Sequence, residues 1–103
     1  MYRAIIHYHF KKGMEEKGIR FFENVMMKKA QELGCHDLEL WISEKDPSIL
    51  VGMGSWNSLE EARAFQSFFQ AQEKEFLQMC TSMPKREFYK IHKSFEEKKR
   101  KSA

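Results

Sequence analysis

Hydrophobic and polar positions alternate over Tyr2–Phe10, the first segment of the chain. Its even positions are apolar or aromatic, and its odd positions carry Arg3, Ile5, His7 and His9. Side chains two residues apart on a strand point to the same face, so this alternation predicts a strand with one face against a core. From Met14 to Leu33 the apolar residues recur every three or four positions, which predicts an amphipathic helix, and Gly34 is typical of its end.

The next segment predicts a β-hairpin. Asp37–Ser43 alternates again, and a turn at Asp46 and Pro47 connects it to a third strand, Ile49–Trp56. The faces of the second strand carry Leu38, Leu40 and Ile42 on one side and Glu39 and Trp41 on the other. Glycines at 52 and 54 indicate either close packing of the helices or room for a ligand, depending on the face that they occupy.

A second helix begins at Ser58. Ser58 and Glu61 have the spacing of a capping box, in which the hydroxyl and the carboxylate each satisfy a free backbone N–H group. Polar residues at 72–73 interrupt the apolar stripe of this helix, so we expect a bend or a break there. Pro84 forbids continuation of the helix, and Arg86–Phe95 predicts the last strand.

This order, β-α-β-β-α-β, predicts an α+β fold of the ferredoxin-like type. Right-handed crossovers give one four-stranded antiparallel sheet with both helices on one face and the first strand between the third and the fourth. The face without helices then carries Ile5, His7, His9, Glu39 and Trp41. A patch that contains Trp and Ile indicates a covered surface, and we expect a second copy of the chain to cover it, as a homodimer.

Length and composition indicate one globular domain. The chain has 103 residues, of which 42% are hydrophobic and 32% are charged, and it is too short for two ordinary cores. We assign residues 1–95 to the domain and residues 96–103 to a basic, disordered tail. Lys and Arg outnumber Asp and Glu by 18 to 15. This excess is too small to indicate a nucleic-acid partner, although the tail also fits a nuclear-import address.

Cysteine usage and hydropathy favour a cytoplasmic protein. Cys35 and Cys80 are the only cysteines in the sequence and lack metal-binding spacing, so we expect reduced thiols. The sequence shows neither an apolar signal segment nor an apolar run long enough to span a bilayer. We therefore expect a cytoplasmic location and no membrane partner.

The segment Gly54–Phe68, GSWNSLEEARAFQSF, carries a resemblance to a known family. A third strand that ends in an aromatic residue, followed by a Ser-capped helix with inward Ala and Phe, resembles the antibiotic-biosynthesis-monooxygenase-like group of the dimeric α/β-barrel superfamily. The resemblance covers Tyr2 to about Phe95. It implies a ferredoxin-like domain that dimerises by packing sheet on sheet, with a pocket between the sheet and the helices or near the interface.

The resemblance also implies several activities. Members include cofactor-independent oxygenases of aromatic polyketides or quinols, heme-degrading enzymes and proteins that bind small molecules. Heme-degrading members are similar in having an Asn on the first strand, an aromatic residue inside the second helix and a His further along it. Here His7 or His9 stands on the first strand and Phe65 near the helix aromatic, but the helix segment 70–76 contains no His. The iron ligand is therefore missing, and we expect no cofactor.

Three roles are open for His7 and His9. The first role is hydrogen bonding across the dimer interface, the second is that of a general base or proton shuttle, and the third is metal ligation. A metal site would need a third donor, which His92 on the adjacent last strand supplies only if it faces the same way. We assign no metal, and we take His7 and His9 as the candidate catalytic residues.

The candidate residues of a substrate pocket are Trp41, Trp56, Phe65 and His92. Trp41 is either an anchor of the dimer interface or a stacking wall for a flat aromatic ligand. We expect a small-molecule-binding protein that resembles cofactor-independent monooxygenases, in which His7 or His9 takes a proton from an aromatic or quinol substrate. The alternative is a non-catalytic homodimer that uses the same scaffold for binding or interaction.

Overall fold

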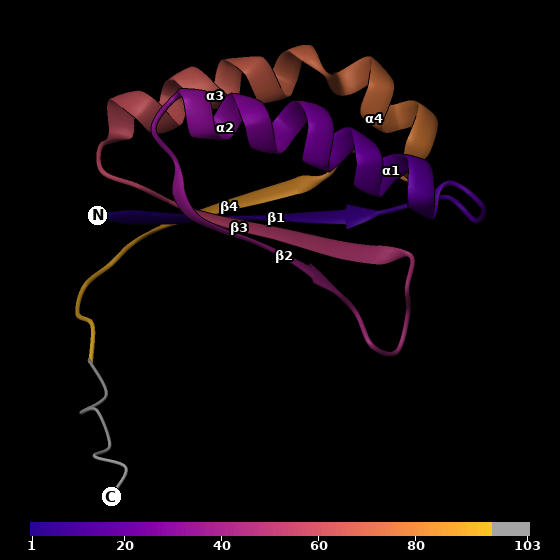
Figure 1. Ribbon diagram of the computed structural model, residues 1–103, viewed down its shortest axis with the longest axis horizontal. Helices are drawn as coiled ribbons and strands as arrows, with labels where there is room; N and C mark the ends of the chain where they lie inside the picture. Colours follow the sequence, from indigo (N-terminus) through magenta and orange to yellow (C-terminus); the bar gives the residue numbers. More distant parts are fainter. Residues whose placement is uncertain (96–103) are drawn as a thin grey trace, which may run out of the picture.

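The computed structural model describes residues 1–95 and has the predicted order of elements. Helices cover one face of a four-stranded sheet with strand order β2-β3-β1-β4 (Figure 1). The strands are β1 (Tyr2–His9), β2 (His36–Ile42), β3 (Ile49–Trp56) and β4 (Lys85–Lys90). All neighbouring strands are antiparallel. The predicted ferredoxin-like arrangement is confirmed, with β1 inside the sheet and β2 and β4 at its edges.

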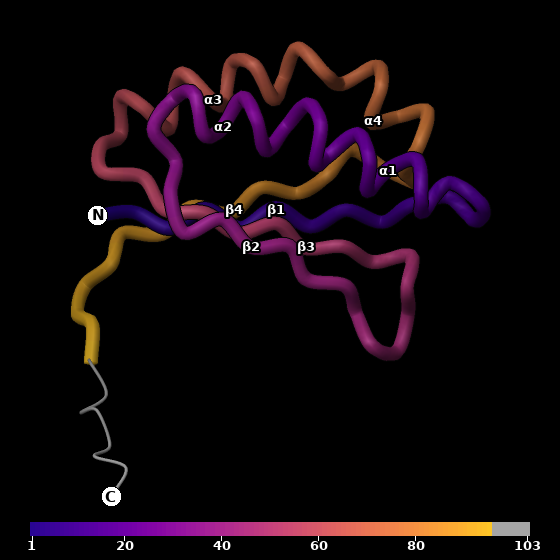
Figure 2. The backbone as a smooth tube through the Cα atoms, viewed as in Figure 1, coloured from indigo at the N-terminus to yellow at the C-terminus, as the bar shows by residue number. Residues whose placement is uncertain are grey.

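The helical layer consists of two segments, and each is interrupted once. The first comprises α1 (Glu15–Phe21), the π-helical turn η1 (Phe22–Met26) and α2 (Met27–Glu32). The second comprises α3 (Leu59–Ala71) and α4 (Glu73–Met79). Figure 2 shows both segments on the same side of the sheet. The break at Gln72 and the left-handed Gly34, with φ 105°, agree with the sequence pattern, whereas the first helix was predicted without the π-helical turn. No helix within residues 1–95 is long and apolar enough to cross a bilayer.

The capping box of α3 is half formed. Ser58 Oγ accepts a hydrogen bond from the backbone N–H of Glu61 at 3.2 Å, as predicted. The carboxylate of Glu61 does not return the bond, because it lies against Gly34 at the end of the first helical segment. Its Oε1 atom is buried without a partner among the described residues.

The last strand is shorter than predicted. β4 ends at Lys90 instead of continuing to residue 95. Lys90 pairs with Tyr2, the first residue of β1. Beyond Lys90, β4 therefore has no residue of β1 to pair with. One backbone hydrogen bond, from Ile91 N–H to the oxygen of Met1 at 2.9 Å, follows the strand. Residues 91–95 then leave the sheet as a short arm on the side opposite the helices (Figure 1). The predicted basic tail, 96–103, lies outside the described residues.

The core lies between the sheet and the helices. Its largest buried side chains include Tyr8, Phe22, Met26, Leu50, Trp56, Phe65, Phe69 and Phe76. Aromatic rings surround Tyr8, whose ring centroid is 5.5 Å from that of Phe22 and 5.7 Å from that of Phe76. The even positions of β1 face this core, as the alternation predicted.

Gly52 and Gly54 face the helices. A Cβ atom at Gly52 would lie 2.7 Å from Cζ of Phe22, and one at Gly54 would collide with Sγ of Cys35. Both glycines therefore permit the helical layer to approach β3 closely. Of the two alternatives that the sequence left open, close packing is the correct one.

We predict that replacing Gly52 by Ala lowers the free energy of unfolding by about 1–3 kcal/mol, the usual cost of overpacking a core. The added methyl group would push against the ring of Phe22. Urea denaturation measures the change. Ser67→Ala, on the exposed side of α3, is the control and should change stability by less than about 0.5 kcal/mol. A Gly52→Ala variant as stable as the parent chain would show that the helices do not pack directly on this part of β3.

Candidate functional site

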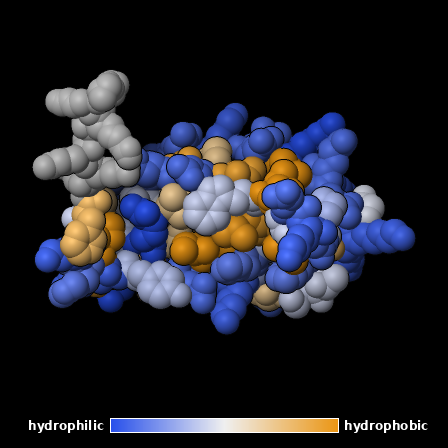
Figure 3. Space-filling model, turned by 90° about the horizontal axis from the view of Figure 1, so that it is seen from below, coloured by the Kyte–Doolittle hydropathy of each residue, from blue (hydrophilic) through white to orange (hydrophobic). Residues whose placement is uncertain are grey.

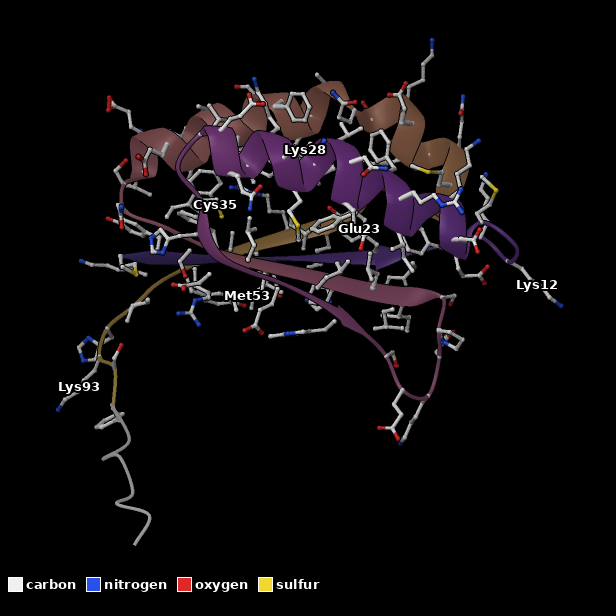
Figure 4. All side chains as sticks on the ribbon, in the orientation of Figure 1. Lys12, Glu23, Lys28, Cys35, Met53 and Lys93 are labelled. Atoms are coloured by element: carbon white, nitrogen blue, oxygen red, sulfur yellow. The ribbon has the colours of Figure 1, made fainter. Side chains whose placement is uncertain are left out.

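The sheet surface opposite the helices, here called the helix-free face, brings several predicted residues into one row. Strand pairing places Trp41, Val51, His7 and Lys85 side by side across β2, β3, β1 and β4. The next row contains Glu39, Met53, Ile5 and Glu87. Apolar side chains gather in the middle of this face with polar ones around them (Figure 3), and Met53 lies on the same side of the sheet (Figure 4). The prediction that His7, Ile5 and Trp41 share a face is confirmed.

His7 forms a pair with a carboxylate on the neighbouring strand. Its Nε2 atom is 3.2 Å from Oε1 of Glu87, and the two side chains are 36% and 33% exposed. A carboxylate that holds an imidazole in place is the arrangement of a general base with its orienting partner. His9 lies one row further along, beside Ile49, and is exposed. Sequence reasoning missed Glu87, because its contact with His7 depends on the register of β4 against β1.

Trp41 lies on the helix-free face with 46% of its surface exposed. Its indole Nε1–H donates a hydrogen bond to Oε1 of Glu39 at 2.8 Å, which holds the indole beside the neighbouring apolar row. Two strand spacings separate Trp41 from His7, so their backbones are about 10 Å apart across Val51. This spacing suits a flat ligand or the side chains of a second sheet.

Trp56 and Phe65 lie on the other side of the sheet, so the predicted single pocket with Trp41 is wrong. Val51 is paired with Trp41 and shares its face of the sheet. Trp56 follows Val51 by five positions on β3, and side chains an odd number of residues apart on a strand point to opposite faces. Trp56 is buried, and its ring centroid is 5.6 Å from that of Phe65. The two rings line a small apolar cavity of about 30 Å³ between the sheet and the helices. This volume is close to that of one water molecule.

His92 is not near the other histidines. It lies in the arm after β4, where it is exposed, and not on the last strand as predicted. Lys90 pairs with Tyr2 whereas His7 pairs with Lys85, so His92 is at the far end of β1, at least about 17 Å from His7 along the strand. No three His, Cys, Asp or Glu side chains within residues 1–95 could hold a metal ion together.

A groove of about 360 Å³ opens between α3 and β4. It is lined by Leu59, Ala62, Arg63, Gln66, Arg86 and Phe88. Arg86 pairs with Ile6, whose side chain is in the core, so the guanidinium also lies on the helix side of the sheet. Sequence reasoning missed Arg86, although an arginine at an inward-facing position of a strand by itself indicates a buried charge.

Arg86 has no acidic partner among residues 1–95. One Nη atom donates a hydrogen bond to the backbone oxygen of Ala62 at 3.3 Å. Its Nε atom is buried without a partner, and its guanidinium carbon lies 5.3 Å from the centre of the Phe88 ring. Burial lowers the pKa of Arg86 because it disfavours the charged form. The groove therefore contains a positive charge that an anion could neutralise.

Known structures share this fold. No protein-family model matches the sequence, and no curated protein matches it. The crystal structure of an antibiotic biosynthesis monooxygenase superposes with a TM-score of 0.74 at 15% identity, over 88% of this chain and 98% of that one. A candidate antibiotic biosynthesis monooxygenase from Nitrosomonas europaea superposes with a TM-score of 0.73 at 14% identity, over 90% and 100% of the two chains.

A third similar structure contains a ligand. It is a monooxygenase from Streptomyces coelicolor in complex with nanaomycin D, with a TM-score of 0.72 and 13% identity over 93% of this chain and 91% of that one. The chain thus has the ferredoxin-like fold of antibiotic biosynthesis monooxygenase-like proteins, as the sequence resemblance predicted.

We predict that Cys35, which lines the small cavity, makes the protein less stable at alkaline pH. Burial raises the pKa of its thiol from 9.0 to about 11. Above pH 9 the unfolded chain loses this proton while the folded chain keeps it. The free energy of unfolding should therefore fall as the pH rises from about 9 to 11.

Urea denaturation at several pH values between 8 and 11, with Cys35→Ala beside the parent chain, measures this effect. The variant should lose less stability across the interval than the parent does. Iodoacetamide at pH 8 should leave Cys35 unmodified in the folded protein and modify it in urea. Rapid modification without urea would show that the thiol is accessible and ionised.

Proposed function

We propose that this chain is a homodimeric small-molecule-binding protein that holds an aromatic anion, such as a deprotonated phenol or quinol, in the groove between α3 and β4. The supporting observation is Arg86, a half-buried guanidinium that has an unpaired Nε atom and forms no ion pair within residues 1–95. A buried cation without an anion is costly, and a phenolate would compensate that cost. Phe88 and Leu59 supply apolar walls for the ring of the ligand.

The reaction that fits this site is oxygenation by molecular oxygen without an organic cofactor. A cation that favours the anionic form of a ligand lowers the pKa of its hydroxyl group. The electron-rich anion then reacts with O₂. For an anthrone, whose anion is also a deprotonated phenol, the CH₂ group becomes a carbonyl in the overall change, one oxygen atom of O₂ enters the product and the other leaves as water. The bound nanaomycin D of the Streptomyces coelicolor monooxygenase supports small-molecule binding on this scaffold.

The helix-free face carries a second candidate site. There, His7 would act as the general base with Glu87 as its orienting partner, and His9 is the other candidate base. Trp41 would be the stacking wall, and a second copy of the chain would close the site. The groove and this face lie on opposite sides of the sheet, so one bound substrate cannot contact both Arg86 and His7.

The proposed homodimer rests on the apolar centre of the helix-free face. Ile5 and Val51, both half-buried, lie together there beside the buried Met53 and the partly exposed Trp41. A single chain leaves Ile5, Val51 and Trp41 partly open to water, and a second copy would bury them. The cytoplasmic location stays a prediction from the sequence.

We predict that replacing Arg86 by Met reduces kcat/KM for the active substrate at least tenfold, because one charge-assisted contact is lost. Oxygen consumption with a panel of hydroquinones and anthrones measures the rate. Methionine keeps most of the apolar length of the arginine, so packing on Phe88 is maintained. Arg20→Met, on the exposed surface of α1, is the matched control, and His7→Ala and His9→Ala should retain full activity.

The same panel separates the candidates. Loss of activity in His7→Ala with full activity in Arg86→Met would assign the reaction to the helix-free face and refute the groove. Background rates in every variant, with ligand binding that still depends on Arg86, would favour the non-catalytic alternative. If the parent chain neither consumes oxygen nor binds any member of the panel, the proposal is wrong for this ligand class.

A further inference from the structure

The arm formed by residues 91–95 encloses a second cleft, at the corner of the sheet where β1 begins and β4 ends. The cleft has a volume of about 500 Å³. Its chemically informative lining residues are Arg3, Lys90, Lys93, His92, Tyr89 and Phe95. The cationic side chains on the face of Arg3 and Tyr89 are those of Arg3 and Lys93, because Lys90 follows Tyr89 on β4 and faces the other side of the sheet. None of the lining residues within 1–95 is acidic. The α3–β4 groove proposed to hold the phenolate is a separate site with a different lining.

Arg3 is the innermost cation of this cleft. In register it lies between Ser55 on β3 and Tyr89 on β4. Within residues 1–95 its Nε atom is buried without a partner, and so is the hydroxyl oxygen of Ser55, whose residue has no exposed surface. The nearest carboxylate by register belongs to Glu87, which pairs with His7. Arg3 makes no ion pair with any residue that the structure describes.

Two aromatic rings stand open to the solvent at the same cleft. Tyr89 is 51% exposed and Phe95 is 84% exposed. The Nζ atom of Lys93 lies 5.3 Å from the centre of the Phe95 ring. Exposed rings beside cationic side chains are the combination that binds a flat aromatic group attached to an anion. Arg3 lies on the helix-free face too, about 13 Å along β1 from His7, so the cleft is at the end of the surface that the proposed second copy covers.

We propose that this cleft binds a small aromatic phosphate of the size of a nucleoside monophosphate. The phosphate would lie between Arg3 and Lys93, and the aromatic ring would stack on Tyr89 or Phe95. A phosphate monoester carries close to two negative charges at neutral pH and so balances two cations better than a carboxylate does. The guanidinium fork of Arg3 also suits two phosphate oxygens at once.

Isothermal titration of the full chain with adenosine 5′-monophosphate tests this proposal. The double variant Arg3→Gln/Lys93→Gln should bind at least about tenfold more weakly, and Tyr89→Ser should also weaken binding. Lys12→Gln/Lys28→Gln is the matched control. It removes the same charge from exposed positions elsewhere (Figure 4) and should bind within about twofold of the parent chain.

Further arms of the titration exclude other sources of binding. Adenosine alone and inorganic phosphate alone should each bind more weakly than the nucleotide, and Arg86→Met should not alter nucleotide binding. Three results would overturn the proposal: no binding of the nucleotide at millimolar concentration, equal binding by the parent chain and the Arg3→Gln/Lys93→Gln variant, or loss of binding in Arg86→Met. None of them bears on the oxygenation assay, which uses a different ligand and depends on a different arginine.

Discussion

The main constraint on this molecule is that helices cover its sheet on one face only. Every strand therefore carries two kinds of positions, and the face that a residue occupies decides what it can contact. The even residues of β1 enter a dense aromatic core around Tyr8. The odd residues Ile5 and His7 remain on a surface whose centre is apolar, next to Val51 and Met53. A second layer would bury that surface, and the proposed layer is the sheet of an identical chain.

The same constraint separates the possible chemistry into two compartments. On the helix side the interior is closely packed because Gly52 and Gly54 admit Phe22 and Cys35, and the main open space lies at the edge, where Arg86 faces the α3–β4 groove. On the helix-free face the His7–Glu87 pair is partly exposed and would lie at the interface of the proposed homodimer. Residues that look similar in the sequence thus have unrelated surroundings, as the two tryptophans show: Trp56 is core, and Trp41 is surface.

Most of the fold could be predicted from periodicity, because alternation and helical spacing report directly on burial. The face of β1, the order of the strands, the Ser58 cap and the break at Gln72 all follow from local patterns. The end of β4 does not, since it depends on where β1 begins rather than on the residues of β4. The π-helical turn at Phe22–Met26 also leaves no mark on the apolar pattern.

The site was harder to predict, because a site depends on register. Alternation places His7 on a face but does not say that Glu87 is within reach of it. Likewise, the sequence places Arg86 on a strand but does not show that its guanidinium lacks an acidic partner. The β-bulge near Asp37, which has a φ of 55°, shifts the pairing of β2 between His36 and Glu39. Such shifts decide which side chains meet, and they appear only when the strands are assembled.

Sedimentation equilibrium of the parent chain at micromolar concentration tests the central claim most directly, because that claim requires a second chain on the apolar sheet surface. We predict a species of twice the chain mass of 12.4 kDa, and a shift to single chains when Val51 is replaced by Lys. A mass of 12.4 kDa at every concentration, or a dimer that Val51→Lys leaves intact, would contradict the account.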